Sequence, residues 1–286
     1  MAGILYVVAT PIGNLEDVTL RALRILREVS LIAAEDTRRT ARLLQHYSIS
    51  TRTTSLHEHN EREKTPRLVE RLQSGESIAL VSDAGTPLIS DPGQTLVAAA
   101  RSAGIRVESI PGASAVMAAV AALGLPATEF TFLGFPPNRS KDRKIWLAEV
   151  AGHPRPVVFF EAPHRIRRTL EALSEVLEPD RTVGIARELT KAHEELVVSP
   201  ISGMLQRLKE VRGEFTVMVF PRLTVADALR SPPDVDRIRV ELGQMIESGQ
   251  SSKRQAVKAL AERYGIGANE LYRMLEGSPS MVIRPK

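Results

Sequence analysis

The sequence predicts an α/β protein with two α/β domains and a small helical domain near the C-terminal end. Short apolar runs alternate with helical patterns over residues 1–120, as expected for βαβ units and a mostly parallel sheet. Residues 121–222 also carry strand and helix patterns, but in an order that favours mixed strand directions. Residues 234–286 are patterned as helices alone, which indicates a separate domain.

Each element of the first domain follows from its residue pattern. Short runs suited to buried strands occupy residues 4–9, 31–34, 53–56, 78–81 and 106–109. Helical patterns occupy residues 19–29, 37–47, 62–72 and 94–103. The first of these helices shows its expected apolar face most clearly, at Leu20, Leu23, Leu26 and Val29, with Ile25 beside it.

The second domain begins near residues 123–126, where a helical pattern stops at a Gly and a Pro. Its expected strands are 130–135, 156–160, 182–186, 196–199 and 214–220. Its expected helices are 143–150, 166–177 and 201–209. The Ser-Pro-Pro-Asp sequence at 231–234 predicts a linker to the helical tail.

Composition limits the classes of protein and of chemistry. The 286 residues are 43% apolar and carry a formal net charge of +4, which permits a nucleic-acid partner without requiring one. The absence of Cys excludes disulfides, thiolate metal sites and Cys nucleophiles. Aromatic residues are only 4% of the chain, which argues against an extended base-stacking platform. No membrane span or signal peptide is recognised, so we expect a cytosolic protein.

The most informative segment is residues 82–93, with the sequence SDAGTPLISDPG. It follows the apolar run at 78–81, so it is expected at the carboxyl end of a strand, where open α/β sheets bind small ligands. It contains no Lys or Arg, which argues against a triphosphate loop. A plain strand-to-helix connection is the alternative, but such connections usually have only a few residues.

Seven ordered blocks carry a resemblance to a known family. They are YVVATPIGN, AAEDTRRT, HEHNE, VSDAGTPLISDPG, PGASA, FFEAPHR and RGEFTV. Together they resemble the tetrapyrrole-methylase-type (class III) methyltransferases, and more narrowly those that 2′-O-methylate a cytidine in small-subunit ribosomal RNA. The resemblance runs from about residue 5 to 220 and continues into the tail. It implies two α/β domains with S-adenosylmethionine in the cleft between them, and commonly a homodimer.

The resemblance also implies which residues contact the cofactor. Carried over position by position, they are Pro11, Gly13, Asp83, Gly85, Thr86, Ser114, Ala115, Ala162 and Arg187. A tight turn explains Pro11 and Gly13 equally well, and Ser114 is also suited to cap a helix.

The residues that assist methyl transfer are less clearly marked. A base or a cation near the ribose hydroxyl would help it react, and the candidates are Glu35, Asp36, Arg38 and Lys191, with Glu188 nearby in sequence. The alternatives are N-capping for Asp36 and a solvated surface position for Lys191. His57 and His59 lack the neighbours of a metal site, so we interpret them as a surface pair.

The tail is expected to form a helix-turn-helix pattern. Ser251 is suited to cap a helix with Val257, Leu260, Ala261 and Tyr264 on one face, and Gly265 ends it before a turn at 266–267. A second helix at 268–275 would place Leu271, Met274 and Leu275 inward. The basic residues suited to RNA phosphates are Lys253, Arg254, Lys258, Arg263 and Arg273. A helical bundle with a solvated basic face is the alternative.

These observations lead to one hypothesis and two rivals. The hypothesis is an S-adenosylmethionine-dependent 2′-O-ribose methyltransferase that acts on small-subunit rRNA or the assembled subunit, and needs no metal. One rival is a tetrapyrrole methyltransferase. The other is a non-catalytic RNA- or DNA-binding module, against which the intact Asp83, Gly85 and Ser114 argue.

Overall fold

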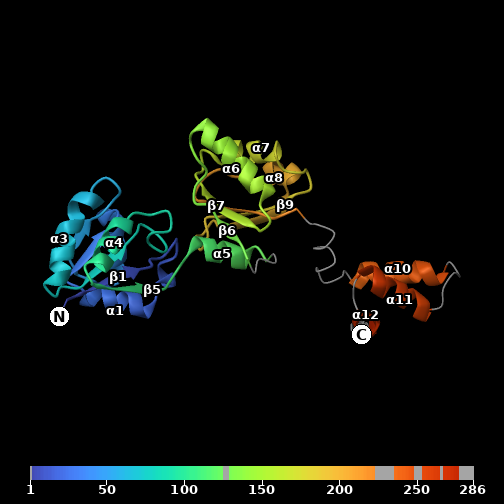
Figure 1. Cartoon of the computed structure of the whole chain (residues 1–286), viewed down its shortest axis with the longest axis horizontal. Coiled ribbons are helices and arrows are strands. Elements are labelled where there is room, and N and C mark those ends of the chain that lie inside the picture. Colours follow the sequence, from blue (N-terminus) through green and yellow to red (C-terminus); the bar gives the residue numbers. More distant parts are fainter. Residues whose placement is uncertain (1, 125–128, 223–234, 248–252, 265–266, 277–286) are drawn as a thin grey trace, which may run out of the picture. The chain divides into compact units, whose positions relative to one another are not determined.

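The computed structural model describes residues 2–124, 129–222, 235–247, 253–264 and 267–276. The chain divides into two compact units, Met1–Pro221 and Arg222–Lys286, and Figure 1 shows their elements. The first unit contains two separate five-stranded sheets. The α/β fold class is thereby confirmed, whereas the domain boundary at residue 120 stays a prediction.

The first sheet is entirely parallel, with the strand order β3-β2-β4-β1-β5. Its strands are β1 (Ile4–Val8), β2 (Leu31–Ala34), β3 (Thr53–Ser55), β4 (Ile78–Val81) and β5 (Arg106–Ile110). Strands β2 and β4 are buried along their whole length, which explains their uninterrupted apolar sequences. Because all five strands run the same way, the loops after β1 and β4 emerge at one edge of the sheet.

Helices cover both faces of this sheet. Helix α1 (Leu20–Glu28) packs on one face with part of α2 (Thr37–His46), and α3 (Glu61–Gln73) and α4 (Gln94–Ser102) pack on the other. One expected core residue is wrong, because Leu20 is 86% exposed. Leu20 is the first residue of α1, directly after the N-cap Thr19, and the face that packs inward begins at Ala22 and Leu23.

The second sheet is mixed, as expected, with the order β6-β7-β10-β8-β9. Its strands are β6 (Thr131–Phe132), β7 (Val157–Glu161), β8 (Thr182–Arg187), β9 (Glu195–Pro200) and β10 (Phe215–Val219). Only β6 and β7 pair in parallel. The strand expected at 130–135 is much shorter in the structure, since the backbone of Gly134 turns to a φ of 63°.

Helices on both faces of the second sheet complete the first unit. Helices α6 (Ser140–Gly152), α7 (Ile166–Ser174) and α8 (Ile201–Arg207) share one core with the sheet. Helix α5 (Ala115–Ala122) contacts strands β8 and β10 and packs on the other face through Val116 and Leu123. Helix α5 therefore brings the end of the first sheet's last strand next to the second sheet.

The second unit is a small helical domain. Its helices are α10 (Val235–Glu247), α11 (Lys253–Tyr264) and α12 (Ala268–Glu276). Val257, Leu260, Ala261 and Leu271 are buried as the sequence predicts, whereas Met274 and Leu275 are half-buried. Helix α10, which has no separate counterpart among the helices expected from the sequence, adds Ile238 and Leu242 to this core. The expected linker at 231–234, Ser251, the side chain of Tyr264 and residues 265–266 lie outside the described residues.

No helix within the described ranges combines the length and apolarity needed to cross a bilayer.

Candidate functional site: a cavity at the strand ends

The loops after β1 and β4 are joined by a two-way backbone bridge. The amide of Thr10 donates to the carbonyl of Gly85 at 2.8 Å, and the amide of Gly85 donates back at 2.9 Å. Gly85 has a φ of 78°, a conformation that glycine adopts without the penalty paid by other residues. The bridge brings together two segments that the sequence placed separately at strand ends.

Residues 82–93 form a loop with strained backbone conformations rather than a simple connection. Leu88 and Ser90 have φ values of 75° and 68°, which are uncommon for residues with side chains. Such conformations persist only where the surroundings enforce them, and they cluster at functional sites. The loop ends at Gly93, whose φ is 118°.

A carboxylate from another helix holds the far end of this loop. Gly93 is the N-cap of α4 and has no side chain with which to bind the first amides of the helix. Instead, the buried Glu61 of α3 accepts hydrogen bonds from the amides of Thr95 at 2.7 Å and Leu96 at 3.1 Å. A negative charge is favourable at this end of a helix. Glu61, from the HEHNE block, thus fixes where the loop finishes.

A cavity of about 330 Å³ opens beside this loop, within the first unit. Its walls come from residues 84–91, the start of α5, the end of β7 and the start of β10. The lining residues are Ile12, Ala84, Gly85, Thr86, Ile89, Ser90, Asp91, Ser114, Ala115, Phe135, Phe160, Glu161, Ala162, Pro163, Glu214, Phe215 and Thr216. The cavity falls within the range of sizes that bind small molecules, and its surface is mainly apolar with a few polar groups.

Five of the nine expected cofactor residues line this cavity. They are Gly85, Thr86, Ser114, Ala115 and Ala162. The Ser114 side chain also accepts a hydrogen bond from the Met117 amide at 3.5 Å, so it caps α5 while bordering the cavity. The Thr86 hydroxyl donates to the carbonyl of Ala113 at 3.2 Å and ties the loop to the start of α5.

The other four expected cofactor residues lie outside the lining. Pro11 and Asp83 border a neighbouring hollow of about 370 Å³. A Cβ atom on Gly13 would lie 2.4 Å from Cγ of Lys191, so the missing side chain is explained by a protein contact. Arg187 is buried and paired with Glu195 at 3.0 Å, which gives it a structural partner. A cofactor contact for these four residues stays a prediction.

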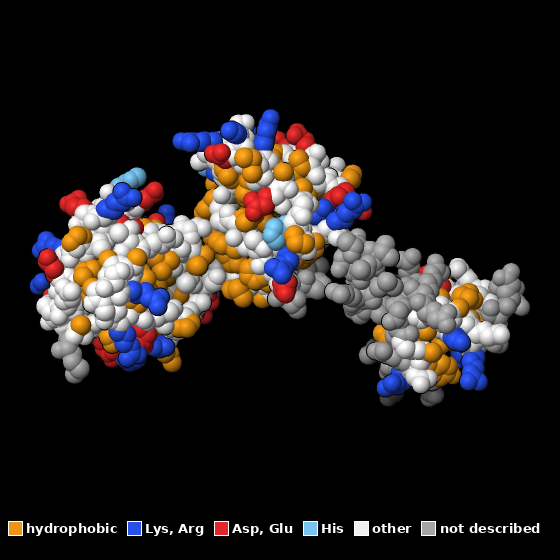
Figure 2. Space-filling model, viewed as in Figure 1, with side chains coloured by type: hydrophobic (Ala, Val, Ile, Leu, Met, Phe, Trp, Pro, Cys, Tyr) orange, Lys and Arg blue, Asp and Glu red, His pale blue; other side chains and the backbone are white. Residues whose placement is uncertain are grey.

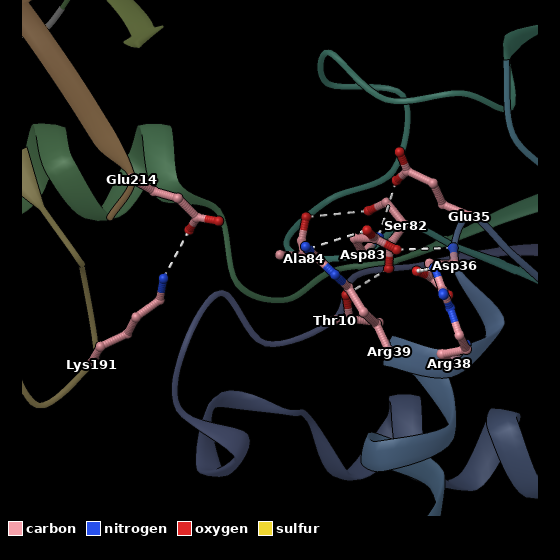
Figure 3. Close-up of polar contacts among 10 residues, drawn as sticks. All are labelled: Thr10, Glu35, Asp36, Arg38, Arg39, Ser82, Asp83, Ala84, Lys191 and Glu214. Carbon is pink, nitrogen blue, oxygen red and sulfur yellow. Dashed lines mark hydrogen bonds and ion pairs between the residues drawn. The ribbon is translucent and has the colours of Figure 1, made fainter. Parts of the chain in front are cut away.

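Asp83 organises a network with the start of α2 (Figure 3). Its carboxylate accepts from the amide of Asp36 at 2.9 Å and pairs with Arg39 at 3.3 Å. The Asp83 amide donates to Glu35 at 3.2 Å. Burial raises the pKa of Glu35 above its ordinary value, although this hydrogen bond opposes the shift. Asp83 therefore joins the loop after β4 to the loop after β2.

Asp36 and Arg38 mainly satisfy each other. Asp36 accepts the amide of Arg38 at 2.8 Å and caps α2, and its carboxylate pairs with the Arg38 guanidinium at 2.9 Å. The Arg38 hydrogen bonds lower the pKa of Asp36 to about 2. The Arg38 side chain is 89% exposed and neither residue lines the cavity. The geometry fits the N-cap alternative, and a catalytic role for Glu35, Asp36 or Arg38 stays a prediction.

Lys191 does not line the cavity, but it pairs with a residue that does. Its ammonium group pairs with Glu188 at 2.8 Å and with Glu214 at 3.0 Å, and Figure 3 shows the second pair. Partial burial lowers the pKa of Lys191, but the hydrogen bonds to the two carboxylates outweigh it and raise the pKa above its ordinary value. Glu214 lines the cavity, so Lys191 is placed one side chain behind the wall.

Asp91 is the residue that the sequence analysis missed. It lines the cavity, and burial raises its pKa to about 6, with the charges of Glu35 and Asp83 adding to the shift and a hydrogen bond from Ser82 opposing it. Its signal was present in the sequence as the second Asp of the 82–93 segment. The first Asp of the segment, Asp83, was assigned the cofactor contact because the family resemblance implies it.

Comparisons with known proteins identify the family. Residues 4–205 match the family model for tetrapyrrole (corrin/porphyrin) methylases. Proteins named ribosomal RNA small subunit methyltransferase I are 50% identical in Vibrio cholerae, over 76% of this chain and 77% of the relative, and 43% identical in Synechocystis, over 95% and 97%. This chain belongs to the ribosomal RNA small subunit methyltransferase I family.

Solved structures show the same methylase fold at lower identity. Uroporphyrin-III C-methyltransferase from Thermus thermophilus has a TM-score of 0.56 at 20% identity, covering 76% of this chain and 94% of that one. The methyltransferase CobJ has a TM-score of 0.60 at 23% identity, covering 78% and 96%. These likenesses concern the fold, while the family membership makes the chain a methyltransferase that uses S-adenosylmethionine.

The two histidines of the HEHNE block lie close together. His57 and His59 have ring centroids 6.0 Å apart, and Nε2 of His57 lies 3.0 Å from the side-chain Nδ2 of Asn60. Among the described residues, no group of three or more metal-ligating side chains is found, with or without these histidines.

The basic residues of the tail are exposed where their side chains are described. These are Lys253, Arg254, Lys258 and Arg273, whereas the Arg263 side chain lies outside the described set. Lys253 is 5.4 Å from the ring centroid of Tyr272, which joins α11 to α12 by a cation–π contact. Their binding to RNA stays a prediction.

Proposed function

We propose that this chain transfers a methyl group from S-adenosylmethionine to the ribose 2′-oxygen of a cytidine in small-subunit rRNA. The observation that carries the proposal is identity of 43–44% to rRNA methyltransferases over 95% of the chain, including the tail. The tetrapyrrole-modifying neighbours match 76–78% of the chain at 15–23% identity. RNA as the substrate therefore accounts for more of the chain than a tetrapyrrole does.

The cavity residues fit the cofactor. Ala84, Gly85 and Ala115 have small side chains or none, which leaves open space in the cavity. A larger residue at Gly85 would crowd Ile12, because its Cβ would lie 3.3 Å from the Ile12 side chain. Ile89 and Phe160 supply apolar surface for an adenine ring. S-adenosylmethionine supplies an electrophilic methyl group on a sulfonium. The protein must position the ribose hydroxyl and accept its proton.

The residues of the chain contribute positioning and proton acceptance. Displacement at a methyl carbon requires an in-line approach, so holding the ribose hydroxyl in place provides much of the rate acceleration. The hydroxyl must also lose a proton, and a base whose pKa lies near the working pH is most effective. Asp91, at about 6 and on the cavity wall, fits this role better than Asp36, whose pKa is about 2.

The cellular form of the enzyme is also part of the proposal. We propose a homodimer that acts in the bacterial cytoplasm, where rRNA is assembled into subunits. Sedimentation of the purified chain tests the dimer, since a monomer at micromolar concentration would contradict it. Parallel assays with protein-free rRNA and with assembled subunits identify the substrate form.

A cavity-filling variant tests the proposed function. Ala115→Leu adds three carbons at the cavity wall, and Ala121→Leu makes the same change at an exposed position of the same helix. The first should abolish cofactor binding and methyl transfer, and the second should leave both near the parent level. The methylated position should resist alkali, because the 2′-oxygen is the internal nucleophile of alkaline cleavage. A methylated base, or a methylated tetrapyrrole with untouched rRNA, would refute the proposal.

A further inference from the structure

A cluster of cations surrounds the first turns of α6 and α7. We name it the α6/α7 basic surface, and it consists of Arg139, Lys141, Arg143, Lys144, Arg165, Arg167 and Arg168. All except Arg143 and Arg165 are exposed. In Figure 2, Lys and Arg side chains gather along the upper edge of the body that carries α6 and α7 in Figure 1. None of these seven residues was among the expected RNA contacts.

The exposed cations of this surface lack neutralising partners. Within the part of the chain that the structure describes, none of the five exposed members forms an ion pair. The exposed carboxylates of helices α6 and α7 are Asp142, Glu149 and Glu171. Positive charge therefore exceeds negative charge here, and it faces solvent.

The two half-buried members share a single buried carboxylate. Glu161 accepts from the Thr169 hydroxyl and pairs with Arg165 at 3.3 Å, while Arg143 donates to Thr169 at 2.6 Å. Burial lowers the pKa of Arg143, and the charges of Arg165 and Arg168 add to the shift against the opposing Glu161. Two guanidinium groups therefore lie near one buried carboxylate, which leaves a net positive charge at this point of the surface.

The α6/α7 basic surface is continuous with the rim of the cavity. Arg165 donates to the carbonyl of Pro136 at 2.6 Å, and Pro163, two residues earlier, lines the cavity. Phe135 also lines the cavity, yet it is 51% exposed. Its ring lies 5.5 Å from that of Phe160, tilted by 54°. An exposed aromatic ring beside a row of cations is the combination that holds single-stranded nucleic acid.

We propose that the α6/α7 basic surface binds the phosphates of the rRNA strand next to the target nucleotide, with a flanking base stacked on Phe135. The proposal rests on the function proposed above and adds where the substrate lies. The phosphates of an RNA strand carry negative charges at regular intervals, which complement a row of unpaired cations. Sequence-specific RNA recognition commonly stacks an unpaired base on an aromatic side chain. An acidic protein surface would match the cations but would not use the exposed ring.

Charge removal tests the phosphate contacts. The variant Arg139→Ala/Lys141→Ala/Lys144→Ala removes three exposed, unpaired cations. Loss of three phosphate contacts to a single strand should lower the slope of log K against log salt by about 2. The same relation gives a roughly 10- to 50-fold weaker Kd for a protein-free rRNA fragment near 0.15 M salt. Cofactor affinity and melting temperature should stay at the parent values, which excludes misfolding.

A matched variant controls for general charge. Arg62→Ala/Arg67→Ala/Arg101→Ala removes three exposed cations from α3 and α4, the helices that pack on one face of the first sheet. It should retain most of the RNA affinity. Equal loss in both variants would overturn the proposal, because binding would then follow net charge alone.

The aromatic contact is tested separately. Phe135→Ala should weaken RNA binding about 10-fold, and Phe135→Tyr should restore it because the ring is kept. If the Arg139→Ala/Lys141→Ala/Lys144→Ala variant binds RNA as tightly as the parent, the proposal is overturned in favour of a protein-binding surface. RNA binding through this surface without methyl transfer by the parent would refute the proposed function and leave the surface intact.

Discussion

Replacing Asp91 by Asn should stabilise the protein at neutral pH while it impairs methyl transfer. Burial raises the pKa of Asp91 from 3.8 to about 6, so the folded state holds the proton more tightly than the unfolded state. Stability therefore falls as the pH rises from 3.8 through about 6, and the full cost is present above that range. Asn carries no charge and avoids this cost.

The expected gain is modest but measurable. The change in pKa from 3.8 to about 6 corresponds to at most about 3 kcal/mol of unfolding free energy, and solvent screening of the partly exposed carboxylate reduces this to about 1–2 kcal/mol. For a unit of this size the gain corresponds to roughly 3–6 °C in Tm. It should shrink at pH 5 and vanish below the unfolded pKa, where Asp91 is protonated in both states.

Thermal unfolding at pH 5 and pH 8, together with kcat at each pH, measures both effects. The parent kcat should rise with pH through about 6 and then level off, whereas the Asn variant should be slow throughout. Asp180→Asn, at an exposed position, is the control and should change neither property. The reasoning is refuted if the gain in Tm is absent at pH 8 or equal at the two pH values.

Three further substitutions test contacts around the site. Gly13→Ala should cost about 1–3 kcal/mol in urea unfolding, because the new Cβ would lie 2.9 Å from the Leu189 carbonyl, whereas Gly152→Ala meets nothing within 4 Å and should be neutral. Thr19→Ala removes the N-cap hydrogen bond of α1 and should cost about 1 kcal/mol; an unchanged urea midpoint would contradict this. Asp83→Ala should weaken S-adenosylmethionine binding at least about 10-fold by calorimetry, and parent-like affinity would remove Asp83 from the cofactor site.

Most of the fold was predictable because its signals are local. The boundaries of β2 and β4 agree with the sequence prediction to the residue, since parallel strands buried on both faces are continuous apolar runs. Leu20 was wrongly assigned to the core. Its position in the helical period is apolar, but periodicity carries no information on whether another element covers the first turn of the helix. Helix α10 was missed because its role depends on packing against α11.

The site was predictable only in part, because its details depend on contacts between distant segments. Gly85 and Ser114 could be found from loop chemistry at strand ends. The sequence does not show whether Gly13 makes room for a ligand or for another part of the protein. The structure shows Lys191 beside it, and Lys191 lies far along the chain. Asp91 received no role from the sequence, because its place on the cavity wall depends on how the loop folds, and the pairing of Arg187 with Glu195 joins two strands that the sequence alone does not align.

The hydrogen bonds from the α4 amides to Glu61 make the cavity loop dependent on a helix that does not touch the cavity. The amides of Thr95 and Leu96 should exchange with solvent only when α3 and α4 separate, so their exchange rates should match those of the α3 interior. Glu61→Gln would keep the shape but lose the charge. Such a change would loosen the loop at its far end, and inherited substitutions in α3 could therefore alter cofactor affinity without contacting the cofactor.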